Sequence, residues 1–125
     1  MINMGREYKY PYTKFGEFLV KLQKKFGENM IDMADRLNVS AQFISNVAHG
    51  RKGVPKDWVD RLVVLYRLPD NQADRLRHLA EESQVFYPVS AKNVSSIKRM
   101  AALSFSKKFA NMDDKTAKKI VRLLG

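Results

Sequence analysis

The chain has 125 residues with no cysteine, and it carries 23 basic against 13 acidic side chains, a net charge of +10. This length allows one cooperative domain, or a small domain with an appendage, and the absence of cysteine excludes disulfides and cysteine-ligated zinc. The positive charge favours a polyanionic partner, whereas the longest apolar run, residues 62–66, is far shorter than the ~20 residues of a membrane helix.

The first part of the chain predicts an arm followed by a helix. Residues 1–12 combine basic and tyrosine side chains without helical periodicity, so we expect a flexible basic and aromatic arm. Such an arm could reach a groove or phosphates of DNA, with a frayed terminus as the simpler alternative. Residues 13–26 predict a helix with one apolar face, which Gly27 ends. Asn29 and Asp32 then predict a cap pair that opens the next helix.

Residues 30–50 are the most informative stretch, because their pattern fits two short helices joined by a tight turn. Apolar residues fall on one face of each helix: Met33, Ala34 and Leu37 on the first, Ile44 and Val47 on the second.

The turn between these two helices carries its own signals. Asn38 tolerates a left-handed backbone, Val39 can fill the turn, and Ser40 is a good N-cap for the second helix. Ala34 is small where the two helices would approach most closely. The stretch therefore predicts a turn between packed helices.

Over residues 15–68 this pattern resembles the lambda-repressor-like (Xre/Cro) helix-turn-helix family. The resemblance implies a compact five-helix DNA-binding domain. Two positions depart from the family: Met30 stands where a phosphate-binding glutamine is common, and Ala48-His49-Gly50 stands where Glu-Asn-Gly is common. The usual phosphate contacts therefore do not carry over directly. The residues that carry the resemblance are Ala34, Leu37, Asn38, Val39, Ser40, Ile44, Val47, and Gly50 followed by basic residues and Pro55.

Two more helices complete the expected domain at residues 13–84. Pro55 suits the first position of a helix over residues 55–68, and Trp58 is expected in its buried face. Asp70 is expected to cap a further helix that runs to about residue 84.

The second helix of the motif is expected to present its polar face to DNA. Gln42 and Asn46 both carry a donor and an acceptor, so either could pair with N6 and N7 of adenine. Any surface helix shows polar residues at this spacing, and only the helix-turn-helix frame favours a reading role. The expected base-reading residues are Ala41, Gln42, Ser45 and Asn46, and the expected phosphate contacts are Ser40, His49, Arg51, Lys52 and Lys56.

The C-terminal segment, residues 85–125, holds most of the excess charge. Residues 83–125 carry 9 basic and 2 acidic side chains, a net of +7, against 14 and 11, a net of +3, in residues 1–82. Residues 85–89 are apolar and β-prone, and Pro88 limits them to a short edge strand. Helices over residues 93–110 and 113–124 are expected to follow.

These C-terminal elements present more apolar surface than they can cover, and they are too small to form an independent domain. They either pack on the preceding domain or complete a core with a second copy. Dimerisation is favoured because DNA readers of this kind match palindromic sites by two-fold symmetry. The expected dimerisation residues are Val85, Tyr87, Val89, Ile97, Met100, Ala101, Leu103, Phe105 and Phe109.

The sequence thus predicts an all-α protein with a lambda-repressor-like domain, a short strand and two C-terminal helices. We expect a cytoplasmic, homodimeric repressor of phage, mobile-element or bacterial origin that binds a palindromic DNA operator in the major groove. The alternative is an antitoxin that binds a toxin through its C-terminal segment and represses its own operon. RNA binding is a third reading, without an RNA-module signature. With no metal-ligand spacing, phosphate loop or cysteine nucleophile, we expect no enzyme, catalytic residue, metal or cofactor.

Overall fold

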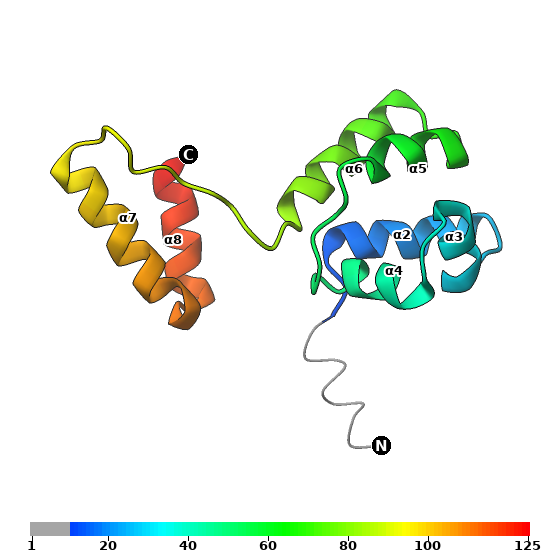
Figure 1. Cartoon of the computed structure of the whole chain (residues 1–125), viewed down its shortest axis with the longest axis horizontal. Helices are drawn as coiled ribbons and strands as arrows, with labels where there is room; N and C mark the ends of the chain where they lie inside the picture. The colour runs from blue at the N-terminus through cyan, green and yellow to red at the C-terminus, as the bar shows by residue number, and fades with distance from the viewer. Residues whose placement is uncertain (1–10) are drawn as a thin grey trace, which may run out of the picture. The chain divides into compact units, whose positions relative to one another are not determined.

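The structure, a computed structural model, describes residues 11–125 and is all-α over that range (Figure 1). The chain divides into two compact units, Met1–Tyr87 and Pro88–Gly125, close to the boundary expected after residue 84. The expected arm falls mostly on residues 1–10, which lie outside the described residues. The elements are α2 (Lys14–Lys25), α3 (Met30–Leu37), α4 (Ala41–Ala48), α5 (Trp58–Tyr66), α6 (Asp70–Glu82), α7 (Ser96–Lys108), the 3₁₀ turn η1 (Phe109–Asn111) and α8 (Asp114–Leu124).

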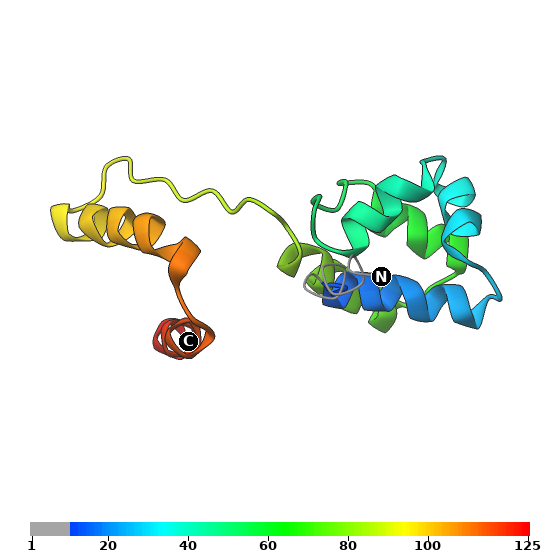
Figure 2. The same ribbon diagram turned by 90° about the horizontal axis from the view of Figure 1, so that it is seen from below.

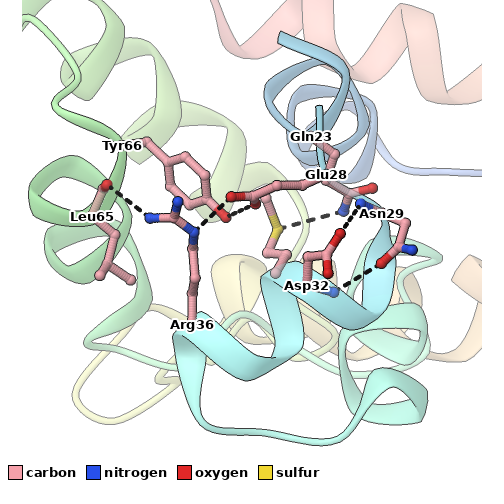
Figure 3. A network of polar contacts seen from close by, with 8 residues as sticks. Gln23, Glu28, Asn29, Asp32, Arg36, Leu65 and Tyr66 are labelled. Carbon is pink, nitrogen blue, oxygen red and sulfur yellow. Dashed lines mark hydrogen bonds and ion pairs between the residues drawn. The ribbon is translucent and has the colours of Figure 1, made fainter. Parts of the chain in front are cut away.

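Side-chain caps fix the starts of α2, α3 and α4. Thr13, Asn29 and Ser40 each accept a backbone N–H from the residue three positions on, at 3.0, 2.9 and 3.0 Å. The backbone N–H of Asn29 also donates to Asp32 at 2.9 Å, so the capping box is complete (Figure 3). Asn38 has φ 58°, the left-handed conformation expected for the turn. These findings confirm the predicted caps at Asn29 and Ser40 and the predicted turn, whereas Thr13, expected inside the helix, is its N-cap.

The starts of α5 and α6 differ from the predictions. Pro55 opens a turn instead of a helix: its carbonyl accepts the N–H of Trp58 at 3.1 Å, and α5 begins there. α5 ends at Tyr66 because the next residue adopts a left-handed backbone, with φ 54°. The predicted cap role of Asp70 is wrong, since Pro69 occupies the N-cap position of α6 and Asp70 is its first helical residue.

The first unit is built around a continuous apolar core. α2 lies between α4 and α6 in Figure 1 and packs against both. Phe15, Leu37 and Ile44 are fully buried, and Trp58 is 1% exposed, which confirms its predicted place in the core. Each such side chain contributes about 1.5–3 kcal/mol of hydrophobic stabilisation. The packing of these helices therefore holds α4 in place.

The beginning of α2 is fixed against the end of α4. The backbone N–H and the hydroxyl of Thr13 both donate to the carbonyl of Ala48, at 3.0 and 3.3 Å. A Cβ atom on Gly16 would lie 2.1 Å from the same carbonyl oxygen, so only glycine permits this approach. α4 is thus held at its C-terminal end as well as along its apolar face.

Two arginines join α3 to α5 reciprocally. Arg61 on α5 donates to the carbonyl of Leu37, the last residue of α3, at 2.8 Å. Arg36 on α3 donates to the carbonyl of Leu65, near the end of α5, at 3.4 Å (Figure 3). Each guanidinium satisfies a C-terminal carbonyl that has no partner within its own helix.

Glu28 connects the loop before α3 to the end of α5. Its carboxylate contacts Nε of Arg36 at 2.6 Å and accepts a hydrogen bond of 2.6 Å from the hydroxyl of Tyr66 (Figure 3). Burial, followed by the hydrogen bond to this carboxylate, raises the pKa of Tyr66. The network makes α3, its preceding loop and α5 one rigid support.

The second unit lacks such a core, since no residue of α7, η1 or α8 is buried. α7 begins at Ser96 after the cap Ser95, later than predicted, and η1 replaces its expected last turn. α8 begins after Asp113, whose side chain accepts the N–H of Thr116 at 2.8 Å. Its predicted buried face is only partly covered, because Leu124 is 81% exposed.

The predicted strand at residues 85–89 is wrong. Residues 84–95 contain neither helix nor strand, as both views show (Figures 1 and 2), and no strand occurs anywhere in residues 11–125. A strand needs a neighbouring edge to pair its backbone groups, and the described chain offers none.

Candidate nucleic-acid interface

α4 has a buried side and a polar side. Ile44 and Val47 are fully buried in the core, and Phe43 is half-buried with its ring edge-on to Trp58 at a centroid distance of 5.7 Å. The polar side carries three of the four predicted base-reading residues, Gln42, Ser45 and Asn46, whereas Ala41 packs against the core. Gln42 is exposed, and Ala41, Ser45 and Asn46 are of intermediate exposure.

The structure joins two of the predicted base-reading residues to one predicted phosphate contact. Oδ1 of Asn46 accepts hydrogen bonds from Nε2 of Gln42 at 3.2 Å and from Nε of Arg51 at 3.0 Å. The carbonyl of Asn46 also accepts the backbone N–H groups of Arg51 and Lys52, at 2.8 and 3.2 Å. The loop after α4 is therefore folded back onto the helix at Asn46.

The other predicted phosphate contacts lie in separate settings. Ser40 is exposed at the start of α4, where its hydroxyl accepts the N–H of Phe43. His49 is half-buried at the end of α4 and stacks on Tyr12, with ring centroids 4.3 Å apart and planes 20° apart. Lys52 and Lys56 are exposed and form no salt bridge within residues 11–125.

The nine predicted dimerisation residues are divided between the two units. Val85 and Tyr87 fall in the first unit. The hydroxyl of Tyr87 donates to the carbonyl of Glu81 at 2.8 Å and accepts the N–H of Gln84 at 3.1 Å, which ties it to the end of α6. The other seven belong to the second unit: one lies before α7, five lie on α7 and one begins η1. All seven are exposed: Val89, Ile97, Met100, Ala101, Leu103, Phe105 and Phe109.

Sequence reasoning missed the contacts that orient these side chains. Arg51 lies five residues after Asn46, outside helical spacing, and it returns to Asn46 only because the chain turns after α4. The stacking of Tyr12 on His49 joins the end of the predicted arm to α4. The available signal was a basic residue shortly after a helix with a polar face, and this signal does not specify which residue it contacts.

Comparisons of the chain with protein-family models, curated proteins and solved structures found no match. Within the described range, no three histidine, cysteine or carboxylate side chains form a group that could hold a metal ion. None of the described helices is long and apolar enough to cross a membrane. The polar side of α4 and the loop after it form the strongest candidate surface.

Proposed function

We propose that residues 13–84 form a lambda-repressor-like helix-turn-helix domain, in which α3 and α4 are the motif and α4 enters the major groove of DNA. The observation that supports this most is the division of α4 into a side fixed in the core and a side of polar groups. A recognition helix needs both: burial holds it rigidly, and exposed donors and acceptors meet base edges.

The proposed activity is sequence-specific regulation of transcription. Gln42, Asn46 and their neighbours on α4 contact base edges, whereas Ser40, Lys52 and Lys56 supply contacts to phosphates. Bound in this way, the protein represses by occupying the groove and blocking polymerase.

The second unit is proposed to make the repressor a homodimer. Leu103, Phe105 and Phe109 are 55%, 45% and 59% exposed, and Val121 and Leu124 form an exposed apolar stripe on α8. A second copy would cover these surfaces and place two recognition helices at half-sites about 34–36 Å apart, one turn of DNA.

Selection of bound duplexes from a random DNA library tests the proposal. The full-length protein is expected to enrich an inverted repeat. Gln42→Ala should weaken binding to that repeat by about 1–3 kcal/mol and leave non-specific binding nearly unchanged. Gln72→Ala, at an exposed glutamine on α6, is the matched control. Indifference of the wild-type protein to sequence would contradict the proposal.

The phosphate role of Lys52 has a distinct signature. Lys52→Ala should weaken binding to every duplex and reduce the slope of log K against log salt concentration by roughly 0.9. Lys24→Ala, at an exposed lysine near the C-terminal end of α2, should leave the slope at its wild-type value. An unchanged slope for Lys52→Ala would make that residue a spectator.

An antitoxin is the second candidate, favoured by the charge of the second unit. Residues 88–125 carry 9 basic and 2 acidic side chains, so two copies would repel each other, whereas an acidic toxin would be attracted. Salt separates the two, because screening strengthens an association of like charges and weakens one of opposite charges. The homodimer proposal predicts that sedimentation of the full-length protein shows a tighter dimer at about 500 mM salt than at about 50 mM salt. A monomer under both conditions would favour the antitoxin.

A further inference from the structure

The hydrogen bonds of Arg51 determine which atoms the polar side of α4 offers to a ligand. A guanidinium only donates, so the atom of Asn46 that Nε of Arg51 reaches at 3.0 Å has to be the carbonyl oxygen Oδ1. Gln42 reaches the same oxygen at 3.2 Å and therefore has to present its amide nitrogen. One guanidinium thus fixes the orientation of both side-chain amides.

The resulting surface is rich in donors. An amide oxygen has two lone pairs, and in Asn46 both are used, by Gln42 and by Arg51. Within residues 11–125, the two terminal nitrogens of Arg51 and the amide nitrogen of Asn46 remain available, and Oε1 of Gln42 is the one acceptor that the three side chains retain. Asn46 would have to give up one of its two hydrogen bonds to accept from N6 of adenine.

Guanine matches this surface better than adenine. In the major groove guanine presents two acceptors, N7 and O6, whereas adenine presents one acceptor and one donor. The fork of terminal nitrogens on an arginine pairs with the two guanine acceptors at once. Because Nε of Arg51 is already held by Asn46, part of the side-chain entropy that such a contact costs is lost before DNA binds.

We propose that Arg51 reads a guanine in the major groove and that Asn46 is the positioning residue that aims it. The proposal rests on the DNA-binding function proposed above. It changes the role expected for Arg51 from the sequence and the role proposed above for Asn46. Arg51 becomes a base-reading residue instead of a phosphate contact. Asn46 acts through Arg51 instead of pairing with adenine.

Variants at Arg51 and Asn46 separate these roles when their base preferences are compared by selection from a random DNA library. Arg51→Lys keeps the charge but loses the fork and Nε. It should lower the preference for guanine at one position of each half-site about tenfold or more, with the salt slope unchanged. Asn46→Asp keeps the acceptor that holds Nε and removes the amide donors, so it should retain the guanine preference even where its added charge weakens all binding. Asn46→Ala should lose most of that preference.

The outcomes are distinct. An equal loss on all duplexes with Arg51→Lys would overturn the inference and return Arg51 to the phosphate role. An adenine preference that disappears in Asn46→Asp would also overturn it, because Asn46 would then be the reader. Enrichment of a sequence without guanine would leave the proposed function standing and remove this inference alone. Failure of the wild-type protein to enrich any sequence would overturn both. Lys52→Ala is the control for a pure phosphate contact, since it should weaken binding to every duplex and keep the guanine preference. Circular dichroism confirms that each variant keeps its helix content.

Discussion

Helices of both units begin at equally good capping residues, but only the first unit has a buried apolar core. Ser95 and Asp113 cap α7 and α8 with the same hydrogen bond to the residue three positions on that Thr13 and Ser40 make in α2 and α4. Yet the first unit buries a continuous cluster of apolar side chains, and the second buries none. Local signals therefore form helices in both, and only the first has enough mutually facing apolar surface to hold them together.

The contrast assigns different tasks to the two units. The first holds α4 by burial and by the close approach of Gly16, and it joins α3 to α5 through Arg36 and Arg61. The second lies below the about 40 residues under which a chain needs a partner, a metal or disulfides to fold. Its apolar side chains, such as Leu103, are exposed, and in the homodimer proposed above a second copy would cover them.

Separating the units should produce the largest effect. A chain of residues 1–87 is expected to unfold cooperatively and to keep its helices, because its core and the contact of Tyr87 with α6 are intact. A peptide of residues 88–125 should be largely unfolded when dilute and gain helix as its concentration rises. Circular dichroism across concentration measures this. A peptide that is helical at every concentration would remove the contrast.

A pair of leucine substitutions should show the same difference within the whole chain. Leu37→Ala, at a fully buried position, is expected to lower the free energy of unfolding by about 2–5 kcal/mol. Leu103→Ala, at a position 55% exposed, should lower it by less than about 0.5 kcal/mol in the monomer and act instead on self-association. Urea unfolding and sedimentation report the two effects. Equal losses of stability would mean that the second unit has a core after all.

The close contact between α2 and α4 is expected to leave no room for a methyl group at Gly16. Gly16→Ala should destabilise the first unit by about 1–3 kcal/mol, although alanine favours helices, because the new methyl group would overlap the carbonyl of Ala48. Lys21→Ala, at an exposed position of the same helix, should change stability little. Thermal melting of the two variants compares them. A neutral Gly16→Ala would show that α4 can move away.

The smallest effect is expected at Tyr66. Tyr66→Phe removes the hydrogen bond to Glu28 and should cost about 0.5–1.5 kcal/mol at neutral pH. Since the folded state raises the pKa of Tyr66 above its ordinary value, this stabilisation is complete below about pH 10 and decreases above it, by up to about 1.4 kcal/mol per pH unit. The free energies of unfolding of the wild type and of Tyr66→Phe should therefore converge as the pH rises above about 10. Parallel curves would contradict the linkage.

The sequence by itself determined the all-α class, the turn at Asn38 and the caps at Asn29 and Ser40, because these depend on residues within a few positions of one another. It also placed the core of residues 30–50, since helical periodicity specifies which faces are buried. It failed at residues 85–89, where β-propensity was present without a neighbouring edge, and at Pro55, where a turn was favoured over a helix.

Tertiary structure alone decided which helices acquire a core and how the polar side of α4 is oriented. The fold directs Arg51 back to Asn46, and thereby fixes which amide atoms face outward, through a turn that no periodicity encodes. Arg36, Arg61 and Glu28 likewise meet partners on distant helices. Hydrogen bonds between segments far apart in the chain depend on where the packed helices place their ends, and this placement exists only once the core has formed.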